Sequence, residues 1–414
     1  MQNIIPNGAT MKTYKLNNQT VDSVELKCLL VSRGVLVQNA VYKYAKDADN
    51  NSRLDINPLC CNCMILSDGT IAQLTDTQFH LRYLSGILSW DNIKLLRHVK
   101  DLHTPFSLRM QNGQPTLFYE NNEVDIVSFP KASNFYKQKT ALGRPFTGNA
   151  VMQGLNWVAF QCLWPCQFAA DKKPCQFCFS GGDFENLAKK GKALPKDVPA
   201  ADVREIVKYA FDNEGVENIQ ITGGSTYNGE VESSHIMSYL NAISELAVPG
   251  ELLLYATPPK DNVTADKYFE LGASRIACSL EVWDKEKARE ITPGKYEFRD
   301  KYLDMLVYIA EKHGSGKAFS NFIIGIEEFD TLANGTTWLA QRGIMPTASV
   351  WMPMGRPVQG SMKAPELDYY RRVKEHLANL YTKYALEPTK SQGLNVCIER
   401  DVWEFAHSAP LGTT

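Results

Sequence analysis

The distribution of apolar and polar residues divides the chain into two parts. From about residue 155, short apolar runs alternate with longer segments whose apolar residues recur every three or four positions, a pattern typical of strands followed by helices. Six strand and helix pairs are predicted: 157–160 with 201–213, 218–222 with 233–246, 251–257 with 262–272, 275–281 with 298–314, 318–325 with 330–343, and 347–352 with 365–385. Because these strands are mostly apolar, the pattern predicts a parallel sheet covered by helices.

We expect this second part to be a partial (β/α)6 barrel of the TIM type over residues 151–360, followed by a helical extension over 361–414. Six units are fewer than the eight of a closed barrel, which usually needs about 250 residues. Ligand-binding side chains are expected at the carboxyl ends of the strands, where parallel sheets of this kind place their sites.

Residues 1–150 show a different pattern and are expected to form an α+β domain that caps the barrel. Short alternating runs flank Asp68-Gly69 and Asn112-Gly113, and such dipeptides are typical of tight β-hairpins. A helix is predicted near 89–99, and a linker near 130–150.

Composition and charge narrow the class of protein. The chain has 414 residues, of which 44% are apolar and 22% are charged, and its formal charge of −2 gives no reason to expect nucleic acid or an anionic membrane as a partner. The amino-terminal segment lacks an apolar signal core, so we expect a cytoplasmic protein without membrane segments. That compartment is reducing, and the ten cysteines are therefore expected to be metal ligands or buried thiols.

Four of these cysteines follow the first predicted barrel strand within seventeen residues. They are Cys162, Cys166, Cys175 and Cys178, and the two residues between the last pair let both thiolates reach one cluster or ion. At the functional end of a barrel strand, this spacing indicates a metal site. The alternatives are a non-catalytic protein that uses all four cysteines as a closed zinc or iron–sulfur site, and buried thiols without a metal.

The cysteine run resembles the cluster-binding segment of the radical S-adenosylmethionine (SAM) superfamily. In that family three cysteines after the first strand bind a [4Fe–4S] cluster, and an aromatic residue precedes the last one, as Phe177 does here. The first spacing departs from the family's commonest one of three residues, because eight residues separate Cys166 from Cys175 and twelve separate Cys162 from Cys175. The resemblance covers about residues 150–360.

The resemblance implies an enzyme with two cofactors, the [4Fe–4S] cluster and SAM. An iron without a protein ligand binds SAM and passes an electron to its sulfonium, which yields methionine and a 5′-deoxyadenosyl radical that abstracts hydrogen from an unreactive C–H bond. The implied partners are a small-molecule substrate and a reducing protein such as flavodoxin or ferredoxin. The sequence does not identify the substrate or the product.

We predict that Cys166, Cys175 and Cys178 are the cluster ligands. Cys162 stands only two residues after the strand, whereas Cys166 follows Pro165, which ends the extended run. The residues between Cys166 and Cys175 include a polar turn at 171–174 that is suited to solvent. Cys162 in place of Cys166 is the alternative first ligand.

Two further strand ends match SAM-binding positions of the family. Gly223, Gly224 and Ser225 resemble the Gly-Gly-Glu stretch that holds the SAM amino group, with serine in place of the acid. Ser279 and Glu281 match a ribose- and carboxylate-binding position, and their spacing of two lets both point inward from one strand. An ordinary turn at the glycines and a surface ion pair at Glu281 are the alternatives.

The fifth and sixth strands add weaker matches. Gly325 resembles the second glycine of the family's Gly-x-Ile-x-Gly-x-x-Glu element, which packs on adenine, and Glu327 and Glu328 are the acidic residues that follow. The segment 351–355 is expected either to close over the adenine edge or to belong to the core. The segment 290–295 resembles a Pro-Gly-Lys stretch of some radical SAM proteins, to which no reaction is attached.

Other candidate groups have a structural interpretation. Cys60, Cys61 and Cys63 are expected to be buried thiols, because adjacent cysteines are awkward ligands, although an auxiliary cluster is left open. His235 is expected on a helix surface. An RNA-modifying enzyme is disfavoured by the acidic balance and by the lack of a basic appended domain.

Overall fold

Apolar runs of three to seven residues form the central sheet of the second part of the chain, as the pattern predicts. The computed structural model describes residues 12–45, 63–77, 103–130, 133–147, 149–163, 166–178, 198–352, 363–389 and 396–408. Within them lies a seven-stranded sheet of order β15-β14-β13-β12-β11-β10-β9. Its strands are β9 (Val151–Gln153), β10 (Trp157–Gln161), β11 (Asn218–Thr222), β12 (Leu252–Tyr255), β13 (Arg275–Ala277), β14 (Ala318–Ile324) and β15 (Met345–Val350). All neighbours from β10 to β15 are parallel, and β9 adds an antiparallel edge strand.

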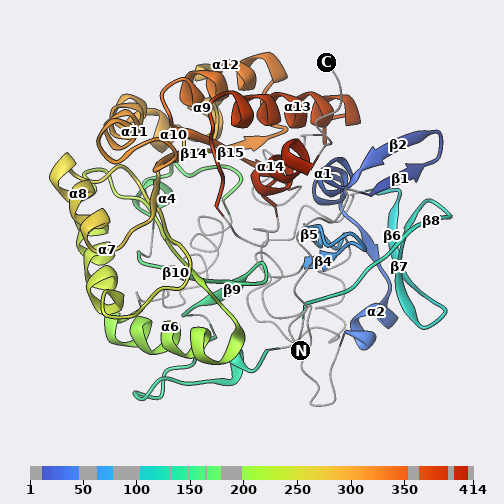
Figure 1. Cartoon of the computed structure of the whole chain (residues 1–414), viewed down its shortest axis with the longest axis horizontal. Coiled ribbons are helices and arrows are strands. Elements are labelled where there is room, and N and C mark those ends of the chain that lie inside the picture. The colour runs from blue at the N-terminus through green and yellow to red at the C-terminus, as the bar shows by residue number, and fades with distance from the viewer. Residues whose placement is uncertain are drawn as a thin grey trace.

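Each parallel strand is followed by a helix, and the six helices surround the curled sheet in an arc (Figure 1). They are α6 (Ala200–Glu214), α7 (Glu230–Ile243), α8 (Asn262–Glu270), α11 (Arg299–His313), α12 (Phe329–Ala340) and α13 (Leu367–Lys383). All six predicted strand and helix pairs are therefore present, and the sheet has the form of a half-barrel. The sequence missed β9 because a three-residue strand is too short to show a period.

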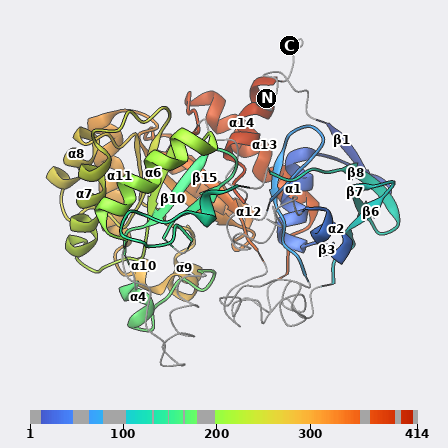
Figure 2. The same cartoon turned by 90° about the horizontal axis from the view of Figure 1, so that it is seen from below.

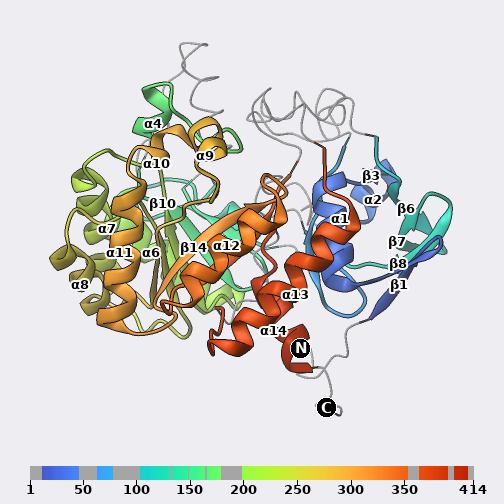
Figure 3. The same ribbon diagram turned by 90° about the horizontal axis from the view of Figure 1, so that it is seen from above.

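Three short helices cluster at one end of the half-barrel. They are α4 (Gln167–Ala170), α9 (Lys285–Ile291) and α10 (Pro293–Tyr296), and Figures 2 and 3 show them grouped beyond the ends of the strands. Asp284 caps the amino terminus of α9 by accepting from the Lys287 N–H, and Pro293 starts α10. The sequence analysis did not predict these helices, because one or two turns do not establish a helical period.

In its described residues, the first part of the chain contains small sheets, two α-helices and one 3₁₀ helix. Its elements are β1 (Thr13–Leu16), β2 (Gln19–Asp22), α1 (Ser23–Arg33), β3 (Leu36–Val37), α2 (Asn39–Tyr44), β4 (Cys63–Ile65), β5 (Ile71–Gln73), β6 (Phe106–Gln111), β7 (Gln114–Tyr119), β8 (Asn122–Ile126) and the 3₁₀ helix η2 (Phe135–Lys137). Hairpins occur at both predicted dipeptides, and Asn112 and Gly113 both have positive φ, as a type I′ turn requires. The helix predicted near 89–99 lies outside the described residues.

The carboxyl-terminal residues contact both parts of the chain. The backbone at 396–398 pairs with β15, and α14 (Glu399–Ser408) follows it. α1 packs against α13 (Figure 3), where Lys374 forms ion pairs with Asp22 and with Glu25. One hydrophobic core runs through both parts, from Tyr14 to Val402. In the described residues, no helix has the length and apolar character needed to cross a membrane.

Candidate metal and cofactor site

The cysteine segment begins as a continuation of β10 and then leaves the sheet. Cys162 still has strand-like pairing, because its N–H donates to the carbonyl of Thr222 at 2.7 Å, and its side chain is 1% exposed. Cys166, Cys175 and Cys178 are each partly exposed. The predicted break at Pro165 lies outside the described residues. None of the eight described cysteines forms a disulfide bond.

Gly223 and Gly224 allow the cysteine segment to lie directly on the end of β11. A Cβ at Gly224 would lie 2.6 Å from the Cα of Cys166, and one at Gly223 would lie 3.1 Å from the Sγ of Cys162. The Ser225 carbonyl accepts from the Gln167 N–H at 2.8 Å. These residues therefore have a packing role toward the cysteines that the sequence did not predict, and any larger residue at 224 would displace Cys166.

The segment that contains α9 and α10 also contacts residues 166–178, which we call the cysteine loop. The Gln176 N–H donates to the Ile291 carbonyl at 2.8 Å, and the Gly294 N–H donates to the Lys173 carbonyl at 3.3 Å. A Cβ at Gly294 would lie 2.5 Å from the ring of Phe168 in α4. The Pro-Gly-Lys stretch thus has a visible structural role, because it carries the contacts that fix the loop.

Phe177 belongs to a small apolar cluster at the same end of the barrel. It packs with residues that follow β13, β14 and β15 and with α9, namely Val282, Ala288, Ile291, Ile326 and Trp351. Trp351 is 2% exposed, so it is a core residue here, which was one of the two expectations for it. Residues 353–355 of that predicted segment lie outside the described residues.

Glu281 has an unusual backbone conformation just beyond β13. Ala277 pairs with Phe319 and Glu281 with Phe322, so the β13 side contains one residue more than β14 between these pairs. Glu281 also has a positive φ of 69°, which is uncommon for a residue with a side chain. This bulge interrupts the alternation from which Ser279 and Glu281 were predicted to point the same way.

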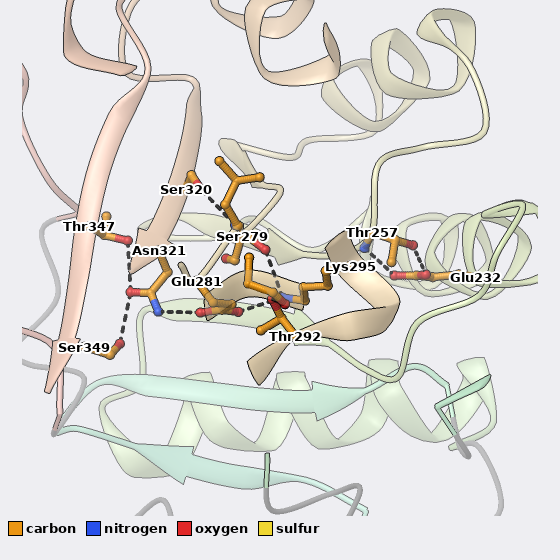
Figure 4. A network of polar contacts seen from close by, with 12 residues as sticks. Glu232, Thr257, Ser279, Glu281, Thr292, Lys295, Ser320, Asn321, Thr347 and Ser349 are labelled. Carbon is orange, nitrogen blue, oxygen red and sulfur yellow. Dashed lines mark hydrogen bonds and ion pairs between the residues drawn. The ribbon is translucent and has the colours of Figure 1, made fainter. Parts of the chain in front are cut away.

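The Glu281 carboxylate is buried in a polar network inside the barrel (Figure 4). It accepts from the Lys295 ammonium at 2.7 Å and from the Asn321 amide at 3.1 Å. Asn321 in turn accepts from the hydroxyls of Ser349 and Thr347. Glu281 is 8% exposed, so the alternative of a surface carboxylate is wrong, although an ion pair is present.

Ser279 contributes both a used and an unused polar atom to this network. Its carbonyl accepts from the Lys295 ammonium at 2.9 Å. Its hydroxyl is buried and has no hydrogen-bond partner among the described residues. An unpaired buried hydroxyl is costly, and a bound molecule would supply the missing partner.

The charges of the network extend to the cysteine loop. Burial by itself lowers the pKa of Lys295, but the Glu281 carboxylate and the Cys175 thiolate outweigh it and raise the pKa above its ordinary value. Burial raises the pKa of the Cys175 thiol, Lys295 opposes that rise, and negative charge on Cys178 and Cys166 adds to it. The charges of the three predicted ligands and of the Lys295 ammonium therefore influence one another.

Gly325 and Glu327 contact protein groups rather than an open site. Gly325 has a φ of 104°, its N–H donates to the Tyr369 hydroxyl, and a Cβ there would lie 3.3 Å from Pro365. Glu327 is buried and accepts from the N–H groups of Trp283 and Asp284, and burial raises its pKa. Glu327 therefore stabilises the start of α9.

Glu232 is a buried acid that the sequence analysis did not select. It lies in the first turn of α7 and accepts from the N–H of Thr257 at 2.8 Å and from the Thr257 hydroxyl. Burial raises its pKa to about 7, although the Thr257 hydrogen bonds and the charge of Lys295 oppose the rise. A polar Thr257 after the apolar β12 was the signal in the sequence that could have pointed to it.

The remaining candidates have structural contacts. His235 was expected on a helix surface, but its Nδ1 lies 2.7 Å from the Cys162 carbonyl, so it supports the end of β10. Cys63 is buried in β4, as expected for a structural thiol. Cys60 and Cys61 lie outside the described residues.

The donor set fits an iron–sulfur cluster. In the described part of the chain, no group of three histidine, cysteine or acidic side chains is arranged to hold a metal ion. A [4Fe–4S] cluster is larger than one ion, so its thiolates stand farther apart, and thiolates are its usual ligands. Three cysteines on one loop would supply the ligands, and the Lys295 ammonium would offset part of their negative charge.

The known proteins to which the chain is similar include a hydroxylase and two proteins that are named as radical SAM enzymes. The bacteriochlorophyllide c C-7(1)-hydroxylase of Chlorobaculum limnaeum is 22% identical to the chain over 297 residues, which are 66% of this chain and 72% of that protein. No family model matches the chain.

Three solved structures match parts of the chain. SuiB of Streptococcus suis, solved with S-adenosylmethionine, has a TM-score of 0.40 and 16% identity over 56% of this chain. The radical SAM enzyme HemN of Escherichia coli has a TM-score of 0.34 and 16% identity over 51% of this chain. A radical SAM methyltransferase of Sphaerobacter thermophilus has a TM-score of 0.38 and 11% identity over 78% of this chain, which spans 91% of that structure. The matched region is about half of SuiB and of HemN, 46% and 50% of their chains.

Proposed function

We propose that this protein cleaves SAM reductively at a [4Fe–4S] cluster and uses the resulting radical on a small organic substrate. The observation that carries the proposal is the cysteine loop, which presents three partly exposed cysteine residues at the carboxyl ends of β10 and β11. Parallel α/β sheets bind their ligands at this end. The chemistry supplied by the bound cofactors is one-electron cleavage of the sulfonium into methionine and a 5′-deoxyadenosyl radical.

Cys166, Cys175 and Cys178 are the proposed cluster ligands. Their partial exposure and the mutual influence of their charges support this set. Cys162 is buried and its sulfur lies against Gly223, which favours a structural role. A closed zinc site of four cysteines, the alternative from the sequence, would have to draw Cys162 away from that position and is not favoured.

Residues at the ends of three strands, and one aromatic residue of the cysteine loop, are proposed to bind SAM. The unpaired Ser279 hydroxyl supports the proposal, and so does the adjacent Glu281 carboxylate, because each of its oxygens has a lone pair left after its present hydrogen bond. The full proposed set is Phe177, Gly223, Gly224, Ser225, Ser279, Glu281 and Gly325. Gly325 has the least support, since Pro365 and Tyr369 cover it.

The proposed organisation is a partial (β/α)6 barrel at 151–360, an α+β cap at 1–150 and a helical extension at 361–414. A cap excludes water, which would quench a reactive radical. Ion pairs between α1 and the carboxyl-terminal helices support a fixed placement of the cap, since Lys27 lies 2.7 Å from Asp401 and Lys374 lies 2.7 Å from Glu25.

The proposed substrate carries an unreactive C–H bond. The hydroxylase relative acts at a carbon atom, and we propose the same for this chain. We do not propose that the two proteins share a substrate. The electron is proposed to come from a small reducing protein such as flavodoxin or ferredoxin. A reducing cytoplasm is the proposed location, in keeping with eight described cysteines that form no disulfide.

Anaerobic reconstitution tests the proposal directly. The purified chain should bind about four irons, as one [4Fe–4S] cluster requires, and should convert SAM to 5′-deoxyadenosine when reduced with dithionite. A Cys175→Ser/Cys178→Ser variant is the control and should do neither. Full occupancy by zinc without SAM cleavage would contradict the proposal.

A further inference from the structure

Lys295 lies between the residues that follow β13 and the cysteine loop. Its side chain is 16% exposed, and its ammonium donates to the Glu281 carboxylate at 2.7 Å and to the Ser279 carbonyl at 2.9 Å (Figure 4). Burying an ammonium is costly unless it is paired and hydrogen-bonded, and both conditions are met here. The contacts therefore hold the charge at one defined point.

The backbone around Lys295 is attached to the cysteine loop. Its neighbour Gly294 donates to the Lys173 carbonyl and lies against Phe168, and Ile291 accepts from the Gln176 N–H. These contacts lie on both sides of Cys175 in the sequence. The position of the ammonium relative to the loop is thus fixed by backbone contacts as well as by the Glu281 ion pair.

The charge of Lys295 acts on the proposed cluster ligands. Negative charge on Cys175 and Cys178 raises the pKa of Lys295 against the effect of burial, after the larger contribution of Glu281. A cluster with three thiolate ligands adds negative charge at this point, and reduction by one electron adds more. A nearby buried cation favours the more negative, reduced state, because net charge and burial set the potential of such clusters.

We propose that Lys295 is a positioning residue of the cluster site, whose buried ammonium makes the cluster easier to reduce and holds Glu281 beside it. The inference rests on the proposed function, since it requires the cluster. A purely structural Lys295–Glu281 ion pair would affect folding stability but would leave the reduction potential unchanged. The potential therefore separates the two roles.

The test is an anaerobic redox titration of the reconstituted protein, followed by electron paramagnetic resonance of the reduced cluster. Lys295→Met should lower the equilibrium constant for reduction at least tenfold, which is about 59 mV for one electron. Lys295→Arg should keep a potential close to that of the unchanged protein, because it keeps the charge. Lys27→Met is the matched control, because Lys27 is also buried and paired with a carboxylate at 2.7 Å, but in α1.

A double variant guards against misfolding caused by an unpaired buried carboxylate. Glu281→Gln/Lys295→Met removes both charges, and its potential should lie below that of Glu281→Gln alone. Equal potentials in Lys295→Met and the unchanged protein, or in the double variant and Glu281→Gln, would overturn the inference. Loss of the cluster in both Lys295→Met and Lys295→Arg would also overturn it, since shape rather than charge would then matter. If the unchanged protein binds no cluster, the proposed function itself fails.

Discussion

Single residues decide where the strand ends and the proposed metal site begins. Cys162 and Cys166 are four positions apart, yet the first is 1% exposed and paired with β11, whereas the second is partly exposed at the start of α4. The difference follows from backbone hydrogen bonding, because the pairing of Cys162 with Thr222 directs its side chain against Gly223. Burial, rather than spacing alone, distinguishes the two cysteines.

A pair of serine substitutions tests the ligand set at this scale. Cys166→Ser should abolish the cluster and the cleavage of SAM, because a ligand is lost. Cys162→Ser should retain both, with a loss of stability of about 1 kcal/mol for a more polar atom at a buried position. Iron content and visible absorption after reconstitution measure the outcome. The reverse pattern would make Cys162 the first ligand.

Glu281 is the residue whose charge should matter most for SAM. Glu281→Gln keeps the shape of the side chain but removes its charge-assisted hydrogen bonds, which should weaken SAM binding by about 2 kcal/mol, or about 30-fold. Calorimetric titration of the cluster-loaded protein with SAM measures the dissociation constant. Glu327→Gln is the matched control, since Glu327 is equally buried but contacts the start of α9. An unchanged affinity would leave Glu281 a purely structural role.

At the scale of elements, the periodicity of apolar residues predicted the long helices and the barrel strands but missed the shortest elements. The predicted strand at 218–222 has the bounds of β11, and the predicted helix at 298–314 differs from α11 by one residue at each end. α9, α10 and the bulge before Glu281 could not be predicted, because each depends on contacts with the cysteine loop or β14 rather than on local pattern. These unpredicted elements carry Lys295 and orient Glu281. The spacing identified the cysteines, but it did not predict the helices and the bulge that contact the cysteine loop.

The close approach of β11 to the cysteine loop yields a prediction for a glycine. Gly224→Ala should reduce iron binding severalfold, because its Cβ would lie 2.6 Å from the Cα of Cys166 and must displace it. Gly250→Ala is the control, since its Cβ would overlap the Asn218 side chain at the opposite ends of the strands. Both variants should lose about 1–3 kcal/mol of stability, as overpacked sites do. Equal iron content in the two would show that the contact at Gly224 does not position Cys166.

At the scale of the whole molecule, buried charges join segments that are distant in the sequence. Lys27 of α1 is fully buried and pairs with Asp401 of α14, next to the buried Glu399. Burial raises the pKa of Glu399 to about 7, although Lys27 opposes the rise, and Glu232 inside the barrel has a pKa raised to the same value. Two separate buried acids therefore couple folding to pH.

The coupling has a definite sign for Glu232. Its pKa is about 7 in the folded chain and near the ordinary 4.5 in the unfolded chain, so the folded chain binds more protons between these values. The contribution of Glu232 to stability is complete below pH 4.5, falls as the pH rises to 7 and is constant above that, because the state that binds more protons is favoured at low pH. At 1.36 kcal/mol per pKa unit, the total change is of the order of 3 kcal/mol. His376 acts in the opposite direction in part of this window, since burial lowers its pKa, so the effect is best measured as a difference between variants.

Glu232→Gln isolates this effect. Glutamine can accept from the Thr257 N–H and donate to the Thr257 hydroxyl, so the hydrogen bonds survive while the titrating group is removed. In urea unfolding between pH 5 and 8, Glu232→Gln should gain stability relative to the unchanged protein as the pH rises, and the gain should level off above about pH 7. Glu245→Gln, at a carboxylate that is 76% exposed, should show no such trend. A stability difference for Glu232→Gln that is the same at every pH would mean that Glu232 does not change protonation in this range, and that Lys295 and Thr257 compensate fully for its burial.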